Sequence, residues 1–310
     1  MPHSILLAKL RALDMPPSIF NWIIAFLTDR SQVCKTVDGR FSALHSITRS
    51  IIQGSGIGPT LWIILESDLH SLSVFNVLFK YADDTNLLVP ENTDVDLADE
   101  FTHIKDWANN NGMIINLQKT KELVLHRPHP RKWSLPQSLE GIEQVQSAKL
   151  LGVIFQGNFS FFDHIDNIFK KICSQRVFLL KQLRDQGLPR ECLHTVFQAI
   201  VLNRLAYAIQ AWGPYMNVEL VHKIDAFLKR VYRYGFVRSI IKIQPLLDTV
   251  MQDLFNKMQS TDHCLHPLLP PDRQLCMNLR ARGHDFQLPS CSHNLHKRSF
   301  VVNCLFKFVR

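Results

Sequence analysis

The sequence predicts an α+β fold, in which short strands and helices in the first half of the chain precede long helices in the second. Short apolar runs, separated by glycine-containing turns, dominate the first half. From Phe161 onward, apolar residues recur at helical spacing. The 310 residues, 46% of them hydrophobic, suffice for one large domain or two modest ones.

The first predicted elements are two helices and a hairpin. Ser4–Leu13 has the pattern of a short helix, and Pro16-Pro17 gives the start signal of a second one. Two alternating runs, Val33–Val37 and Phe41–Ile47, lie on either side of Asp38-Gly39. Asp-Gly between alternating runs is a strong hairpin signal, so we expect these runs to pair.

A loop, a helix and a second hairpin are predicted next. The glycine-rich stretch Gln53–Pro59 leads into apolar residues with helical spacing through Leu72. Val77–Tyr81 and Asn86–Val89 have the composition of two buried strands. Ala82–Thr85 lies between them, so a pair of adjacent aspartates is expected in a tight turn.

A helix and two further strands follow in the predicted order. Thr93 is the expected N-cap of a helix that runs to Asn109. Ile114–Leu125 and Lys149–Phe155 have strand character. The segment His126–Pro136, rich in Pro, Arg and His, is a predicted loop.

Three long helices are predicted after this point, each with basic residues opposite its apolar stripe. They span Ile165–Arg184, Arg190–Trp212 and Val218–Tyr234. Beyond Arg238, five prolines break the pattern into short pieces. We therefore predict three parts, comprising residues 1–160, residues 161–237 and an appended region of residues 238–310.

Composition predicts a protein of the cytoplasm or nucleus. No apolar run has the length of a membrane helix, and the N-terminus lacks the order of a signal peptide. The seven cysteines are scattered between Cys34 and Cys304 without paired spacing, which favours reduced thiols over a disulfide framework. We expect no membrane contact.

Charge is distributed unevenly along the chain. Up to and including Asp163, 14 Lys and Arg accompany 17 Asp and Glu, giving −3, whereas the remainder has 21 against 10, giving +11. Basic residues neutralise phosphates and clustered carboxylates hold cations, so this pattern fits a protein that handles a polyanion. A solvated basic surface explains the charge equally well.

The sharpest local feature is Tyr81-Ala82-Asp83-Asp84, a carboxylate pair at the turn of an apolar hairpin. Buried carboxylates need a cation partner, and nucleotidyl transfer commonly uses two Mg²⁺ ions about 3.5 to 4 Å apart with carboxylate ligands. Taken alone, the pair is better explained as a solvent-exposed turn, because Asp is a common turn residue.

Three further motifs surround the aspartate pair. Gln53-Gly54-Ser55-Gly56-Ile57-Gly58-Pro59 precedes it, and Asn116-Leu117-Gln118-Lys119-Thr120 and Leu150-Leu151-Gly152-Val153 follow it. Four motifs in this order are far more specific than any one. The order resembles that of reverse transcriptases from jockey-like non-LTR (LINE-type) retrotransposons.

The resemblance implies a partial right-hand polymerase palm, with an antiparallel sheet and helices, followed by a helical thumb and a C-terminal tail. The tail motifs are Leu279-Arg280 through Leu288-Pro289 and Lys297-Arg298-Ser299-Phe300. The implied activity is RNA-directed DNA polymerisation. Its implied partners are an RNA template, a DNA primer and deoxynucleoside triphosphates, and its implied cofactor is Mg²⁺.

The resemblance also implies a role for each matching residue. Asp83 and Asp84 are the implied metal ligands and catalytic residues. The implied substrate-binding residues are Gln53, Gly54 and Ser55 beside template and nucleotide, Tyr81 near the primer terminus, Lys119 near the triphosphate, and Leu151 and Gly152 at the primer. For Lys119, a solvated lysine at a strand end is the simpler alternative.

Two departures from the family pattern bear on activity. First, the family's other catalytic aspartate lies on a strand just before the segment that matches Pro2–Leu7, and the fingers precede that strand, so neither is expected within this sequence. We therefore expect the chain to be inactive alone and to bind two ions poorly. Ile51-Ile52 and Gly56-Ile57 also replace the family's usual residues around the glutamine loop.

Other possible ligands are poor candidates, and two other functions remain open. Asp14, Asp29 and Asp68 are poor substitutes because of their expected positions in helices or at helix ends. Cys291, His293, His296 and Cys304 do not have the spacing of a compact zinc finger. The first alternative function is a non-catalytic nucleic-acid-binding remnant that uses basic helix faces, and the second is a decaying copy that folds poorly.

Overall fold

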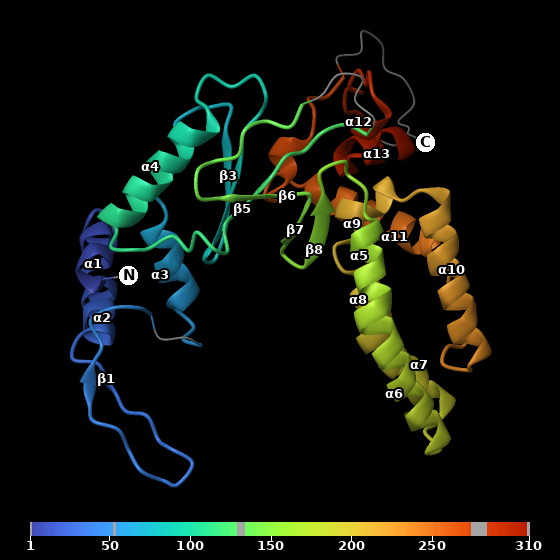
Figure 1. Cartoon of the computed structure of the whole chain (residues 1–310), viewed down its shortest axis with the longest axis horizontal. Coiled ribbons are helices and arrows are strands. Elements are labelled where there is room, and N and C mark those ends of the chain that lie inside the picture. The colour runs from blue at the N-terminus through green and yellow to red at the C-terminus, as the bar shows by residue number, and fades with distance from the viewer. Residues whose placement is uncertain (1, 52–53, 129–133, 274–283, 309–310) are drawn as a thin grey trace. The chain divides into compact units, whose positions relative to one another are not determined.

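The computed structural model describes residues 2–51, 54–128, 134–273 and 284–308. Helices and small two-stranded antiparallel sheets make up the described part of the chain (Figure 1). The chain divides into two compact units, which are described separately. The first comprises Met1–Lys121 with Ser138–Glu143, and the second comprises Glu122–Gln137 with Gln144–Arg310.

The first unit has a small core formed by three helices. These are α1 (His3–Arg11), α2 (Pro17–Leu27) and α3 (Gly58–Leu65), which confirm the helices predicted at these places. Figure 1 shows α2 and α3 beside α1. Six buried side chains at helical spacing form the core: Leu6, Leu10, Ile23, Leu27, Leu61 and Leu65. The third helix ends at Leu65, earlier than predicted.

The hairpin around Gly39 has much shorter paired segments than predicted. β1 (Ser31–Gln32) pairs with β2 (His45–Ser46), and only a single bridge, Lys35 to Phe41, lies closer to the turn. Gly39 has φ +83° and its N–H donates to the Thr36 carbonyl. Residues in both arms are exposed, so no core packing extends the pairing.

The second hairpin is confirmed, but its predicted burial is wrong. β3 (Val77–Tyr81) pairs with β4 (Asp84–Leu88), and most of its side chains are exposed. Phe79 is 58% exposed and Tyr81 is 65% exposed. Apolar composition predicts burial but does not show which segment packs against the strands. Among the described residues, few pack against this hairpin.

α4 (Leu97–Asn110) begins later than predicted, and its N-cap is Asp96 instead of Thr93. The Asp99 N–H donates to Asp96 Oδ1 at 2.9 Å. Thr93 donates its hydroxyl to Asn76 Oδ1 at 2.7 Å. Thr93 thus joins the loop before α4 to the segment that leads into β3.

Glu100 anchors the same segment from within α4. Its carboxylate is fully buried and accepts hydrogen bonds from Leu72 N, Ser73 N and Asn76 Nδ2 at 2.9 to 3.0 Å. Burial alone would raise the pKa of Glu100, but these hydrogen bonds outweigh it and lower the pKa. The carboxylate therefore fixes the chain immediately before β3.

The predicted strand at Lys149–Phe155 is a hairpin. β7 (Ser147–Leu150) and β8 (Val153–Gln156) pair around a two-residue turn, Leu151-Gly152. The prediction missed the turn because Leu is a rare first residue in such a turn. The division between the units runs through β5 (Lys121–Leu123) and β6 (Glu143–Val145), which form another two-stranded sheet.

Helical segments in the second unit confirm the three predicted long helices. They are α5 (Phe162–Asn167), α6 (Ser174–Asp185), α7 (Arg190–Phe197), α8 (Asn203–Ala206), α9 (Ile209–Trp212) and α10 (Val218–Arg233). π-helical turns at Ile168–Cys173 and Gln198–Leu202 join α5 to α6 and α7 to α8. Arg176 donates to the Ile200 carbonyl in the second of these turns. Ala208, with φ +51°, ends the second long helix before α9.

Beyond Arg238, the expectation of short pieces alone is wrong. α11 (Ile243–Met258) is a full helix that buries an apolar face, and α12 (Asn294–Arg298) and α13 (Phe300–Lys307) follow later. Pro245 lies in the first turn of α11, where a missing N–H removes no helical hydrogen bond. The tail motif at Leu279-Arg280 lies outside the described residues.

A large apolar core holds the second unit together. It contains residues of the long helices and of α11, among them Phe197, Trp212 and Phe255. By length and composition alone, the helical run Arg190–Tyr215 would be long and apolar enough to cross a membrane. Buried residues of this run, among them Val201, Leu205 and Ile209, belong to this core.

Candidate functional site

The aspartate pair lies at a tighter turn than predicted. Tyr81 pairs with Asp84 across the hairpin, so the turn consists of Ala82 and Asp83, and Asp84 already belongs to β4. Ala82 has φ +51°, in the left-handed region that such turns require. Both carboxylates are exposed, and a ligand in solvent can reach them.

A tryptophan from α3 holds this turn. Trp62 Nε1 donates to the carbonyl oxygen of Ala82 at 2.5 Å. Lys80, next to Tyr81 in β3, donates to the carbonyls of Glu66 and Leu69 at 2.6 and 3.0 Å. These carbonyls lie just after the end of α3. A side chain of the helix therefore donates to the hairpin, and a side chain of the hairpin donates to the segment after the helix.

Glu66 is a third carboxyl group near the turn that the sequence prediction missed. Its side chain is buried, with only 7% of the residue exposed. Burial raises the pKa of Glu66 and the Asp83 charge adds to this, whereas Lys80 and a hydrogen bond from Trp62 act in the opposite direction. Its signal in the sequence was an acidic residue directly after the apolar run Leu61–Leu65.

Asp68, which the sequence predicts to be a poor substitute ligand, is bound by two other side chains. Asp68 pairs with Lys9 at 2.6 Å and accepts a hydrogen bond from Trp107 Nε1 at 3.0 Å. Although burial opposes it, these two donors lower the pKa of Asp68. Among the described residues, no group of three His, Cys, Asp or Glu could hold a metal ion.

The glutamine loop is described only in part. Gln53 lies outside the described residues. Gly54 has φ +82° with open space around the position of a Cβ, and Ser55 is partly exposed. The Ser55 carbonyl accepts the Gly58 N–H at 3.2 Å, at the point where α3 begins. The loop therefore leads directly into the helix that holds the Asp83 turn.

Lys119 lies in a turn, so its predicted place in a strand is wrong. Asn116 forms this turn, because its side-chain oxygen accepts the Lys119 N–H at 3.2 Å and its carbonyl accepts the Thr120 N–H at 3.0 Å. Such local bonds compete with strand pairing. Strand structure is therefore limited to Lys121–Leu123, and the Lys119 side chain is exposed.

Leu151 and Gly152 form the turn of the β7–β8 hairpin in the second unit. Their φ angles are +45° and +90°. The Tyr207 hydroxyl donates to the Leu151 carbonyl at 2.8 Å. A Cβ on Gly152 would lie 3.3 Å from the Tyr207 ring, so the turn and the ring are in close contact. Tyr207 was not predicted as a site residue.

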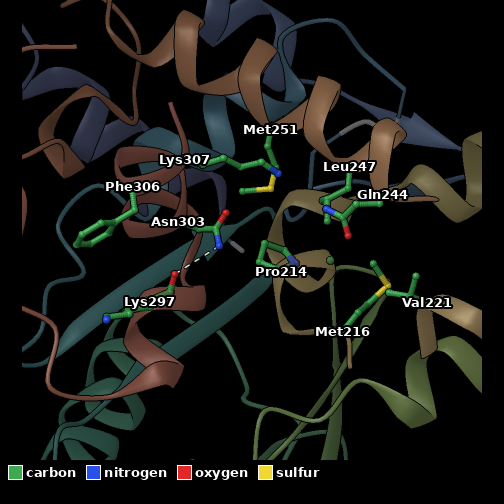
Figure 2. A pocket seen from close by; sticks show the side chains of 11 residues that line it. Pro214, Met216, Val221, Gln244, Leu247, Met251, Lys297, Asn303, Phe306 and Lys307 are labelled. Atoms are coloured by element: carbon green, nitrogen blue, oxygen red, sulfur yellow. Dashed lines mark hydrogen bonds between the residues drawn. The ribbon is translucent and has the colours of Figure 1, made fainter. Parts of the chain in front are cut away.

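The second unit also contains a cavity of about 480 Å³ (Figure 2). Met216, Leu247 and Met251 form part of its apolar lining, and Lys297 and Lys307 are its charged residues. Lys307 forms an ion pair with Asp248, and the Lys297 carbonyl accepts a hydrogen bond from Asn303. None of the predicted site residues lines this cavity.

Cys304 is an unsuitable zinc ligand. It is buried in the core of the second unit, and burial raises the pKa of its thiol to about 12. The thiol therefore stays protonated at neutral pH, whereas zinc binds the thiolate.

Comparison with known proteins adds the family. A model of the family "Reverse transcriptase (RNA-dependent DNA polymerase)" matches residues 1–155, which is half of the chain. The chain is 28% identical over 232 residues to an RNA-directed DNA polymerase from mobile element jockey of Drosophila melanogaster, covering 68% of this chain and 24% of that protein.

Two further relatives agree. Identity is 23% over 267 residues with a probable RNA-directed DNA polymerase from transposon X-element of Drosophila melanogaster, covering 80% of this chain and 29% of the relative. It is 25% over 199 residues with a retrovirus-related Pol polyprotein from type-1 retrotransposable element R1 of Nasonia vitripennis, covering 60% and 59%.

The chain thus spans about a quarter of the two Drosophila relatives. No solved structure is significantly similar to it. The family match covers the first 155 residues, including the aspartate hairpin, the glutamine loop and the Leu151-Gly152 turn. The chain therefore belongs to the reverse transcriptase family, as a member of the LINE type that jockey and R1 elements carry.

Proposed function

We propose that this chain is the palm, thumb and tail portion of an RNA-directed DNA polymerase. In this proposal the first unit and the β7–β8 hairpin belong to the palm, the helices within residues 161–237 form the thumb, and residues 238–310 form the tail. The observation that carries the proposal is the exposed Asp83-Asp84 pair at the tip of a hairpin inside the matched region.

Asp83 and Asp84 are the proposed Mg²⁺ ligands. Carboxylate oxygens are the hard donors that Mg²⁺ prefers, and both side chains are accessible. When bound, two such ions would activate the primer 3′-hydroxyl and stabilise the leaving pyrophosphate. The donor type fits, but the described residues offer no third ligand in a suitable group. We therefore propose that these residues alone do not support polymerisation.

The remaining motif residues have proposed roles around this centre. Gln53, Gly54 and Ser55 would lie beside the template and the incoming nucleotide, and Tyr81 beside the primer terminus. The exposed Lys119 would offset phosphate charge on a deoxynucleoside triphosphate. Leu151 and Gly152 would support the primer. We propose the cytoplasm or nucleus as the location of the chain, and the scattered cysteines without paired spacing support this proposal.

Primer extension on an RNA template with Mg²⁺ tests this proposal. We expect no extension by the 310-residue chain, and we expect weak Mn²⁺ binding, measured by electron paramagnetic resonance, that disappears in an Asp83→Ala, Asp84→Ala variant. Glu91→Gln, at an exposed position outside the hairpin, is the control and should bind Mn²⁺ as the unaltered chain does.

Two results would change the proposal. Extension by the unaltered chain that is lost in the double variant would show that the chain completes the active site itself. Equal Mn²⁺ binding by the unaltered chain and the double variant would remove the aspartate pair from the proposal.

A non-catalytic nucleic-acid-binding remnant is the second candidate function. Lys229, Arg230 and Arg233 on α10 are exposed, and none of them belongs to an ion pair among the described residues. Such residues bind phosphates without regard to sequence, and the affinity falls steeply with salt. A gel-shift titration at two salt concentrations separates this function from no binding at all.

A further inference from the structure

The turn of the β7–β8 hairpin is held in an unfavourable backbone conformation by contacts from a distant helix. Leu151 has φ +45°, a region that residues other than glycine, asparagine and aspartate rarely occupy. Tyr207, at the end of α8, donates its hydroxyl to the carbonyl of this residue at 2.8 Å. Strained positions that the surroundings impose are concentrated at functional sites.

Tyr207 is itself fixed by a closed set of contacts. Its carbonyl accepts the Trp212 indole N–H at 3.1 Å, and the Trp212 ring packs edge-on against His164 with centroids 5.2 Å apart. His164 Nδ1 accepts the Ile154 N–H at 3.3 Å, which leads back to strand β8. The contacts therefore hold both the tip and the strand of the hairpin on the same helical scaffold.

One side of this scaffold carries positive charge, where Arg204 is partly exposed and Tyr207 and Leu151 are exposed. Tyr207 is 44% exposed and Leu151 is 43% exposed. The Arg204 guanidinium lies 5.5 Å from the centre of the Tyr207 ring. The ion pairs of the described residues do not include Arg204, and the exposed Lys149 on β7 adds a second cation near the turn in sequence.

We propose that Arg204, Tyr207 and the Leu151-Gly152 turn form one surface that contacts the sugar–phosphate backbone of a nucleic acid. We name it the strapped hairpin surface. This inference rests on the proposed function, because it adds Arg204 and Tyr207 to the turn already proposed to support the primer. No sequence motif assigns these two residues.

Each part of the strapped hairpin surface suits a polynucleotide. A guanidinium presents several N–H donors in a plane that matches phosphate oxygens. An exposed tyrosine ring offers a face on which a sugar or base can stack regardless of sequence. Gly152 has no side chain, so the Tyr207 ring packs directly against the turn and the two present one continuous surface. The positive charge of the distal part of the chain favours a polyanion over a neutral partner.

Fluorescence anisotropy with the full 310-residue chain tests the inference. The probe is a labelled RNA–DNA hybrid with a recessed DNA 3′ end, titrated between about 50 and 200 mM KCl, where phosphate contacts dominate the salt dependence. Arg204→Gln should weaken binding about tenfold at the lower salt and reduce the slope of log affinity against log salt by about one.

Three further variants separate the contributions. Arg204→Lys keeps the charge and should keep the salt slope while losing part of the affinity. Tyr207→Leu removes the ring and should weaken binding at every salt concentration. Tyr207→Phe removes only the hydroxyl that holds the Leu151 carbonyl, so it should weaken binding less than Tyr207→Leu.

The matched control is Arg184→Gln. Arg184 also lies over an aromatic ring, 5.7 Å from the centre of Phe236, but it is paired with Asp185. Its replacement should leave affinity and salt slope unchanged. If all variants and the control bind equally, the strapped hairpin surface is not a nucleic-acid contact while the proposed function stands. If the unaltered chain does not bind the hybrid, both proposals fail.

Discussion

Single side chains from helices hold the two turns that carry motif residues. Trp62 donates to the Ala82 carbonyl and Tyr207 to the Leu151 carbonyl, across 20 and 56 residues of sequence. Both acceptors belong to residues with positive φ. An aromatic donor from a helix thus compensates a strained turn in each unit, and neither pairing could be read from the sequence because partners so distant leave no local pattern.

The protonation state of His164 bears on the stability of the second unit. It is 3% exposed, and its Nε2 has no hydrogen-bond partner among the described residues. Burial, together with the charge of Arg204, lowers the pKa of His164 from 6.5 to about 4. The unfolded chain therefore binds a proton at His164 at higher pH than the folded chain does.

This difference gives a prediction for acid sensitivity. The contribution of neutral His164 to stability is fully present above pH 6.5 and is lost as the pH falls toward 4, amounting to about 2 kcal/mol between pH 7 and pH 5. Urea unfolding at both pH values measures it. His164→Asn keeps an acceptor for the Ile154 N–H but does not titrate, so its stability should fall less; an equal fall in both proteins would contradict the assignment.

At the scale of elements, the sequence predicted helices better than strands. Apolar periodicity and proline starts located α1, α2 and the long helices of the second unit. The sequence does not predict α11, because a proline normally breaks a helix, whereas Pro245 lies in the first helical turn, where it is tolerated. The sequence predicts one strand in place of the β7–β8 hairpin, because the Leu151-Gly152 turn lacks the Asn or Asp that usually marks a hairpin turn.

The interaction of α4 with the segment before β3 gives a second prediction. Glu100→Gln leaves one carbonyl oxygen where two carboxylate oxygens accepted three donors, so it should destabilise the first unit by about 1 to 3 kcal/mol. Hydrogen exchange of residues 72–80 should increase. Because the folded pKa of Glu100 is lowered, its contribution is present above pH 4.5 and is lost below it.

Glu91→Gln is the control for this prediction, since Glu91 is exposed in the loop before α4. It should leave the exchange of residues 72–80 unchanged. Equal exchange in the Glu100→Gln variant and the control would show that the buried carboxylate does not hold this segment.

At the scale of the whole molecule, the described residues form two separate apolar cores. One lies among α1, α2 and α3, and the other among the helices of the second unit. The two structural units divide the chain near β5 and β6. The functional division at residue 160 that the sequence suggested stays a prediction. Apolar periodicity locates each core but does not show which distant segments share it.

Two cores predict two local responses to core truncation. Leu61→Ala should destabilise the first unit and Phe197→Ala the second, by about 2 to 5 kcal/mol each, because each leaves a cavity in a fully buried site. Hydrogen exchange followed by mass spectrometry should show faster exchange in the affected unit alone. Faster exchange throughout the chain after either substitution would mean that the two units unfold together.

The sequence predicted the motif residues of the candidate site but not the side chains that contact them. The order of motifs singled out Asp83, Asp84, Leu151 and Gly152 as candidates, although it did not predict the turn at Leu151-Gly152. The sequence did not predict the roles of Glu66, Trp62 and Tyr207. Their burial and hydrogen bonds depend on which distant segments of the chain lie together in the fold. For Lys119, the sequence motif was recognised but the predicted strand is wrong, because hydrogen bonds to Asn116 form a local turn.

The exposed β3–β4 hairpin has a consequence for handling the protein. In the described part of the chain, these strands pair only with each other, and Val77, Phe79, Tyr81 and Leu88 are at least 40% exposed. Apolar strands with open edges recruit strands from other molecules. A concentrated preparation is therefore expected to self-associate through this ribbon, and solubility rather than folding would set the usable concentration.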